Sequence, residues 1–136
     1  MAADLYLASS YDELDANRIP VELSFENDGY YWFLYRYFES ANLDRRHELI
    51  DLYGGAEICG YQLDRLEDEL HTALLDIQGH PALWPVLVGW SSGTVCRETE
   101  DKRMIEKVKL VAVIESLLGL IKRAREEKLK LVYVGD

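Results

Sequence analysis

Residues 63–77 read LDRLEDELHTALLDI, the most regular pattern in the chain. The apolar residues recur at spacings of three and four, at Leu63, Leu66, Leu70, Leu74 and Ile77. This spacing places them on one face of a helix and leaves the charged residues on the other face. Gly79 and Pro81 follow, and they predict where the helix ends.

A second amphipathic helix is predicted closer to the C-terminus. Its apolar residues also share one face: Leu110, Val113, Ile114, Leu117, Leu118, Ile121 and Ala124. The basic residues Lys122, Arg123 and Arg125 lie in its last turns, where cations suit the negative end of the helix dipole. The two helices together indicate a core that is covered on one side by helical faces.

An aromatic block, YYWFLYRYF at residues 30–38, holds seven of the chain's 15 aromatic residues. The preceding residues Asn27-Asp28-Gly29 fit either a hairpin turn or a helix start capped by Asp28. We predict a helix to Asn42, because apolar residues fill the block and then give way to polar ones. One helix cannot bury all seven rings on one face, so core packing is the first interpretation and a protein interface the second.

Short strands are predicted between these helices. They fall at 4–14 (a strand, then a turn of helix), 21–25, 49–53, 83–90 and 129–134, with a hairpin pairing 94–98 and 103–108 across loop 99–102. Gly54-Gly55 is predicted to form a turn before a helix that starts near Cys59. The chain is therefore predicted to be a single α+β domain, residues 1–136. Its sheet would be mostly antiparallel, with four to six short strands and two or three helices packed on one face.

The formal net charge is −10, and the pI is about 4.7. Such a surface repels nucleic-acid phosphates and anionic membranes, so we expect neither as a partner. It suits a basic protein, although solubility alone also explains it. No apolar run approaches the ~20 residues that span a bilayer, and the N-terminus lacks signal-peptide features, so a cytoplasmic location is expected.

No motif for catalysis, metal binding or cofactor binding is found, and the chain is expected not to be an enzyme. Glu67 and His71 are four residues apart, which is typical of a solvated helix pair. Cys59 and Cys96 are predicted to be free thiols, with a disulfide between them as the alternative. The acidic groups Glu67-Asp68, on the first helix, and Glu98, Glu100 and Asp101, at an exposed hairpin tip, are predicted to be solvated surface.

Four segments carry a resemblance to a known class of protein: 29–39 (GYYWFLYRYFE), 50–56 (IDLYGGA), 117–121 (LLGLI) and 131–136 (LVYVGD). In this order they resemble small bacterial immunity proteins of toxin systems, with Arg36 and Gly55 standing where proline and aspartate would be expected. The resemblance implies a non-enzymatic protein that covers the active site of a cognate toxin. It brings no active-site residue with it.

A basic toxin would be attracted by the acidic surface, so the predicted contact residues are Glu67, Asp68, Glu98, Glu100 and Asp101. The alternative function is a structural or regulatory interaction module, a homodimer formed through the aromatic block. An enzyme comes third, and it would need a pocket that gathers His71 or His80 with Cys59 or Cys96.

Overall fold

The structure is a computed structural model that describes residues 2–16, 18–41, 50, 54–92 and 98–135, with residues 15, 16, 90–92 and 98–100 described by their backbone alone. Its strands are β1 (Ala2–Ala8), β2 (Leu23–Glu26), β3 (Gly55–Ile58), β4 (Leu83–Ser92), β5 (Glu98–Glu106) and β6 (Lys130–Gly135). Its helices are α1 (Glu13–Ala16), α2 (Gly29–Ala41), α3 (Tyr61–Ile77) and α4 (Lys107–Glu127). The architecture is the predicted α+β fold.

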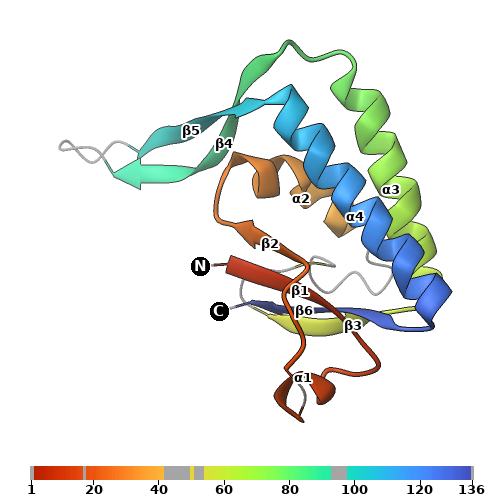
Figure 1. Ribbon diagram of the computed structural model, residues 1–136. Coiled ribbons are helices and arrows are strands. Elements are labelled where there is room, and N and C mark those ends of the chain that lie inside the picture. Colours follow the sequence, from red (N-terminus) through yellow and green to blue (C-terminus); the bar gives the residue numbers. More distant parts are fainter. Residues whose placement is uncertain (1, 17, 42–49, 51–53, 93–97, 136) are drawn as a thin grey trace.

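Four strands form the main sheet in the order β2-β1-β6-β3, and every pair is antiparallel. In β1, alternation points Leu5 and Leu7 into the core and Tyr6 to the other face. Figure 1 shows the three long helices on one side of this sheet and the short α1 on the other. The second sheet is a ribbon of two strands, β4 and β5, which projects from the body beside α2.

The aromatic block forms the predicted helix, α2. The Asp28 carboxylate caps it, accepting the backbone N–H groups of Tyr30 at 3.0 Å and Tyr31 at 3.1 Å. The rings of Tyr31 and Phe38 are buried in the core, whereas Trp32 is only half-buried, at the edge of the helix. The first interpretation, core packing, therefore holds for part of the block only.

Helices α3 and α4 confirm the two amphipathic patterns. The apolar face of α3 packs into the core through Leu63, Leu66, Leu70 and Ile77, with Leu74 at its margin. The apolar face of α4 does the same through Leu110, Ile114, Leu117 and Ile121. Periods close to 3.6 residues, sustained over four turns or more, made both helices predictable.

Two local predictions around residue 55 are wrong. Gly55 begins strand β3, opposite Val134 of β6, and does not form a turn. The strand has only four residues, too few to show alternation, and it exists because the edge of β6 pairs with it. The residue at the start of α3 is Gly60, with φ 58°, and not Cys59. A left-handed entry of this kind favours glycine and uses no side-chain cap.

The predicted hairpin is also placed differently. The partner of residues 103–106 is the start of β4, and Thr99 and Lys102 are strand residues paired with Ser91 and Leu87. The polar residues 99–102 predicted a loop. They lie instead in a strand of the ribbon, and strands that face solvent need not alternate apolar with polar residues. Val108 belongs to α4. The predicted strands 49–53 (apart from Ile50) and 94–97 lie outside the described residues, as does Cys96.

Candidate functional site

The predicted acidic contacts on α3 are only partly available to a partner. Glu67 faces α4, and its carboxylate accepts a hydrogen bond from Arg125 at 2.7 Å, beside a second bond from Arg125 to Asp64. The hydrogen bonds to Glu67 and Asp64 raise the pKa of the Arg125 guanidinium above its ordinary value. Asp68 is exposed to solvent. Of this group, Asp68 is therefore better placed than Glu67 to meet a partner.

The second acidic group lies along β5. Asp101 is 3.8 Å from Arg103 on its own strand, so its charge is partly compensated. Glu98 and Glu100 pair through their backbones with Ser92 and Trp90, in the outer part of the ribbon. Figure 1 places the outer ribbon and α3 on opposite sides of the molecule, so the fold does not join the two acidic groups into one surface.

The fold does assemble a surface that the sequence had not shown. An open groove of about 380 Å³ lies between α2 and β4, here called the aromatic groove. Its principal lining residues are Trp32, Phe33, Arg36, His80, Trp84 and Leu87. They come from two elements and the connection between α3 and β4, which are brought together because α2 packs against the start of the ribbon.

Three rings form the floor of the aromatic groove. The imidazole of His80 stacks on Trp84, with ring centroids 4.3 Å apart and planes at 24°. Phe33 meets both rings edge-on, at 5.8 Å from His80 and 5.7 Å from Trp84. Edge-to-face and offset-stacked rings are favourable arrangements. Phe33 and Trp84 are also part of the core, so the floor of the groove is packed against the body of the protein.

Arg36 forms one wall of the aromatic groove. Its guanidinium lies 4.8 Å from the ring centre of Tyr37 and donates a hydrogen bond of 2.7 Å to the Tyr37 hydroxyl. That hydroxyl in turn donates to Asp76 of α3 at 2.5 Å. Burial, and then the bond to Asp76, raise the pKa of Tyr37 to about 12, so the phenol stays neutral. Arg36 is thus held in place although its side chain is 66% exposed.

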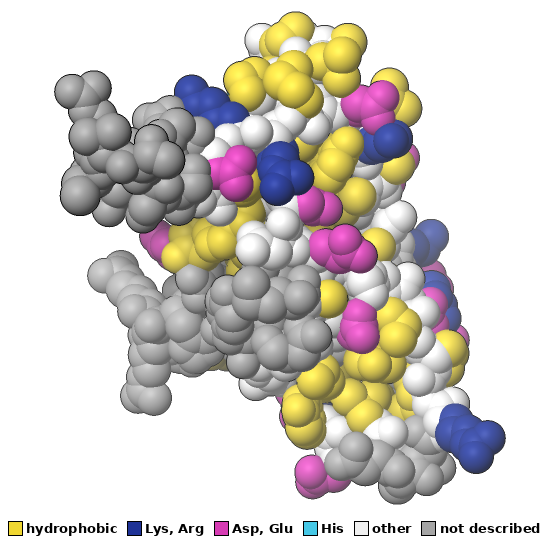
Figure 2. Space-filling model, turned by 90° about the vertical axis from the view of Figure 1, so that its left-hand side faces the viewer, with side chains coloured by type: hydrophobic (Ala, Val, Ile, Leu, Met, Phe, Trp, Pro, Cys, Tyr) yellow, Lys and Arg dark blue, Asp and Glu magenta, His cyan; other side chains and the backbone are white. Residues whose placement is uncertain are grey.

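The outward side of the ribbon also exposes apolar side chains, beside the charged residues Lys102 and Glu106 that are paired with Leu87 and Leu83. Leu83 is 53% exposed, Leu87 is 40% exposed and Met104 of β5 is 61% exposed. We call these three residues the ribbon face. Figure 2 shows hydrophobic side chains gathered at the top of the molecule, where in Figure 1 β4 begins and α4 starts. Exposed apolar clusters of this kind are common at protein interaction sites.

The described residues do not bring Cys59 together with His71 or His80, and Cys96 lies outside them. Cys59 precedes α3 and His80 follows it, so this 17-residue helix, about 25 Å long, separates them. His71 is exposed on the helix between them. Cys59 is a free, half-buried thiol. Among the described residues, no three His, Cys, Asp or Glu side chains gather as a metal site, and no helix is long and apolar enough to cross a bilayer.

Comparisons of the chain with protein-family models, with curated proteins and with solved structures gave no significant match. The function is therefore inferred from the surfaces of the protein alone. One signal in the sequence pointed to the aromatic groove: Trp32 and Arg36 are four residues apart and share a stripe of α2. Trp84 and His80 carried no such signal, because they follow α2 by more than 35 residues and reach it only through the fold.

Proposed function

We propose that the chain is a non-enzymatic immunity protein that binds and neutralises a cognate bacterial toxin, with the aromatic groove as its principal contact. The observation that carries this proposal is the composition of the groove. Tryptophan and arginine side chains dominate the binding energy of protein interfaces. Here the Trp32 indole N–H donates to Asn27 at 2.6 Å and Arg36 donates to the Tyr37 hydroxyl at 2.7 Å, so both side chains have partners within the chain before any toxin binds. Such preorganisation reduces the ordering cost of binding.

The charge of the chain supports a basic toxin as the partner. A net charge of −10 attracts a basic protein over long range and raises the rate of encounter. In this proposal Asp68 and Asp101 steer the toxin, together with Glu98 and Glu100 on the ribbon. Glu67 contributes mainly to the long-range electrostatic field of the protein, because its carboxylate is hydrogen-bonded to Arg125. The complex would form in the cytoplasm of the cell that makes the toxin.

The test is to tag the chain in its native bacterium and identify, at low and high salt, the proteins that co-purify with it. One stoichiometric basic protein, encoded beside this chain and toxic when expressed alone, is the expected result. Because rim charges act mainly on the association rate, that rate should fall as salt is raised. Recovery of the chain with no such protein, combined with no protection against the neighbouring gene product, would overturn the proposal.

Two leucine variants would locate the contact. Leu87→Asp introduces a charge into the aromatic groove, and Leu75→Asp introduces the same charge at a 67% exposed leucine of α3 outside the groove lining. We expect Leu87→Asp to weaken toxin capture by about tenfold or more and Leu75→Asp to leave it nearly unchanged. Equal effects of the two variants would show that the groove is not the contact.

A second candidate function is a self-associating interaction module, and the exposed ribbon face is the observation that favours it. A two-fold dimer would pair Leu83, Leu87 and Met104 with the same residues of another copy. Sedimentation at rising protein concentration distinguishes this candidate, because a dimer through the ribbon face would be lost on Met104→Asp. A monomer at all concentrations would overturn this second candidate.

A further inference from the structure

The connection between β1 and β2 is far longer than the pairing of these strands requires. The two strands are antiparallel neighbours, and hairpins of this kind usually need about two to five connecting residues. Here residues 9–22 join them, fourteen in all, and they include α1. We call the described residues of this connection, 9–16 and 18–22, the strap. Figure 1 shows its α1 on the side of the sheet away from the long helices.

Two contacts fix the near end of the strap to the sheet. The backbone N–H of Tyr11 donates to the carboxylate of Glu57 in β3 at 2.6 Å, and Lys130 of β6 donates to the same carboxylate at 2.9 Å. The Tyr11 ring also lies directly over Gly55, where an added Cβ would sit 3.0 Å from the ring. The strap therefore crosses the sheet from β1 as far as β3, which places Tyr11 at a defined position.

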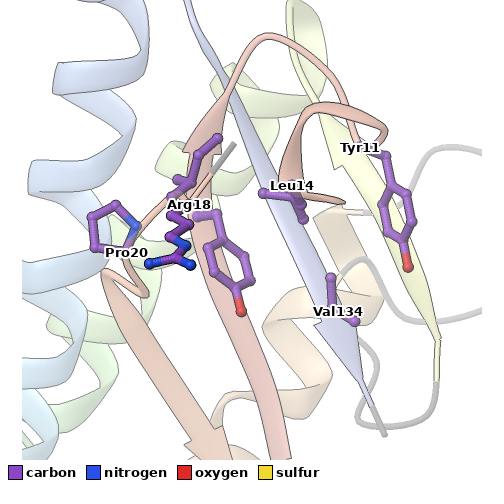
Figure 3. Close-up of a pocket in the computed structure, with 7 residues that line it drawn as sticks. Tyr11, Leu14, Arg18, Pro20 and Val134 are labelled. Carbon is purple, nitrogen blue, oxygen red and sulfur yellow. The ribbon is translucent and has the colours of Figure 1, made fainter. Parts of the chain in front are cut away.

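A pocket of about 610 Å³ remains between the strap and the sheet, within the size range of small-molecule sites. Its apolar lining comes from Leu14, Ile19, Pro20 and Val134, and its polar lining from Tyr6, Tyr11 and Arg18. Figure 3 shows Arg18 and Tyr11 on opposite sides of the pocket, with Leu14 and Val134 between them. We call it the strap pocket. The strap pocket and the aromatic groove are formed by different elements of the fold.

Arg18 is the only cation of the pocket lining, and no described carboxylate pairs with it. A guanidinium fork matches a carboxylate in bidentate geometry. Asp4 lies on the same face of the sheet, bound to the Ser24 hydroxyl, and its charge opposes a dianionic ligand more strongly than a monoanionic one. The whole protein, at −10, opposes polyanions in the same way. The chemistry of the pocket thus selects one negative charge on an apolar body.

We propose that the strap pocket binds a small hydrophobic monocarboxylate. Arg18 holds the carboxylate, Leu14, Ile19 and Val134 surround the apolar body, and the hydroxyls of Tyr6 and Tyr11 are available as neutral hydrogen-bond partners. This site is independent of the proposed toxin contact.

The test is an NMR titration of the full chain with three probes: 3-phenylpropionate, indole-3-propionate and decanoate. At least one should give saturable shifts at the backbone amides of Tyr6, Leu14 and Val134. The uncharged analogue, such as 3-phenylpropanamide for the first probe, should bind about tenfold more weakly or worse, because the charge-assisted hydrogen bonds are lost. Absence of saturable binding by all three acids would overturn the proposal.

Variants then assign the carboxylate contact. Arg18→Gln should lower the affinity for the acid to about that of the amide, and it should leave the amide unaffected. Arg103→Gln removes another exposed arginine, from the ribbon and outside the pocket lining, and should change neither affinity. If Arg18→Gln bound the acid as the parent chain does, or if both variants weakened it equally, the assignment to Arg18 would be wrong.

Discussion

The central strand of the main sheet and the first strand of the ribbon make an instructive comparison. Leu5 of β1 has no exposed surface, whereas Leu87 of β4 is 40% exposed. Both are leucines in antiparallel strands. The difference lies in what covers them. Helices cover one face of the main sheet, and the strap crosses the other face. Helix α2 packs on one face of the ribbon, and the outward face of the ribbon stays open.

This difference suggests a division of roles. The sheet holds most of the buried apolar surface of the described strands, and the stability of the fold should be concentrated there. The ribbon holds Trp84 and Ile105 in the core, packs Val86 against it, and exposes Leu83, Leu87 and Met104 to solvent. Five measurements test this contrast, in decreasing order of expected effect.

Leu5→Ala should destabilise the protein by about 2–5 kcal/mol, because it leaves a cavity in a fully buried site of the central strand. Urea unfolding followed by circular dichroism measures the change. A loss below about 1 kcal/mol would mean that the sheet core collapses around the cavity and that the main stability lies elsewhere.

Gly29→Ala tests the connection between the ribbon and the body. Gly29 is the first residue of α2, and an added Cβ would lie 2.4 Å from Cγ2 of the fully buried Ile105 in β5. We expect a loss of about 1–3 kcal/mol in urea unfolding, since a packed site must move. Gly119→Ala is the matched control in α4, where a Cβ meets nothing within 4 Å. It should stabilise by about 0.5–1 kcal/mol through helix propensity.

Asp28→Ala removes the cap of the aromatic helix, on which both the core and the aromatic groove depend. We expect a loss of about 0.5–2 kcal/mol in thermal unfolding. Asp28→Asn keeps an acceptor for the Tyr30 and Tyr31 amides and should lose far less. Equal losses would show that the charge near the helix N-terminus, and not the cap geometry, is the source of the stabilisation.

The strap should be held less firmly in acid. Hydrogen bonds from Lys130 and then from the Tyr11 N–H lower the pKa of Glu57 below its ordinary 4.5. Glu57 therefore stabilises the folded state above pH 4.5, and this contribution is lost as pH falls through the lowered value. The protection factor of the Tyr11 amide, which compares its exchange rate with the intrinsic rate at the same pH, should therefore fall over that range. The variant Glu57→Gln should have a lower protection factor at neutral pH and show little further change in acid.

Leu87→Ala should have the smallest effect, within about 0.5 kcal/mol of the parent chain in urea unfolding, because the side chain is already partly in water. The same substitution at Leu5 and Leu87 then measures the contrast directly. A loss at Leu87 comparable with that at Leu5 would show that the ribbon face is covered in solution, as it would be in a dimer.

The sequence predicted well those elements that carry their own signal. The apolar stripes of α3 and α4 extend over several turns, and Asp28 is next to the helix that it caps. Such patterns depend on neighbours in the chain. The composition also determined the acidic character of the surface, and this character favours a basic partner.

Strand β3, the register of the ribbon and both candidate sites were decided by the tertiary structure. The four residues of β3 form a strand because β6 offers an edge, and Trp84 meets Phe33 because α2 packs on β4. Arg18 joins Val134 across more than 100 residues of sequence. The physical reason is the same in each case. The periodicity of a helix can be recognised from the spacing of residues that are close in the sequence. Strand pairing and pockets, in contrast, depend on segments that only the folded chain brings into contact.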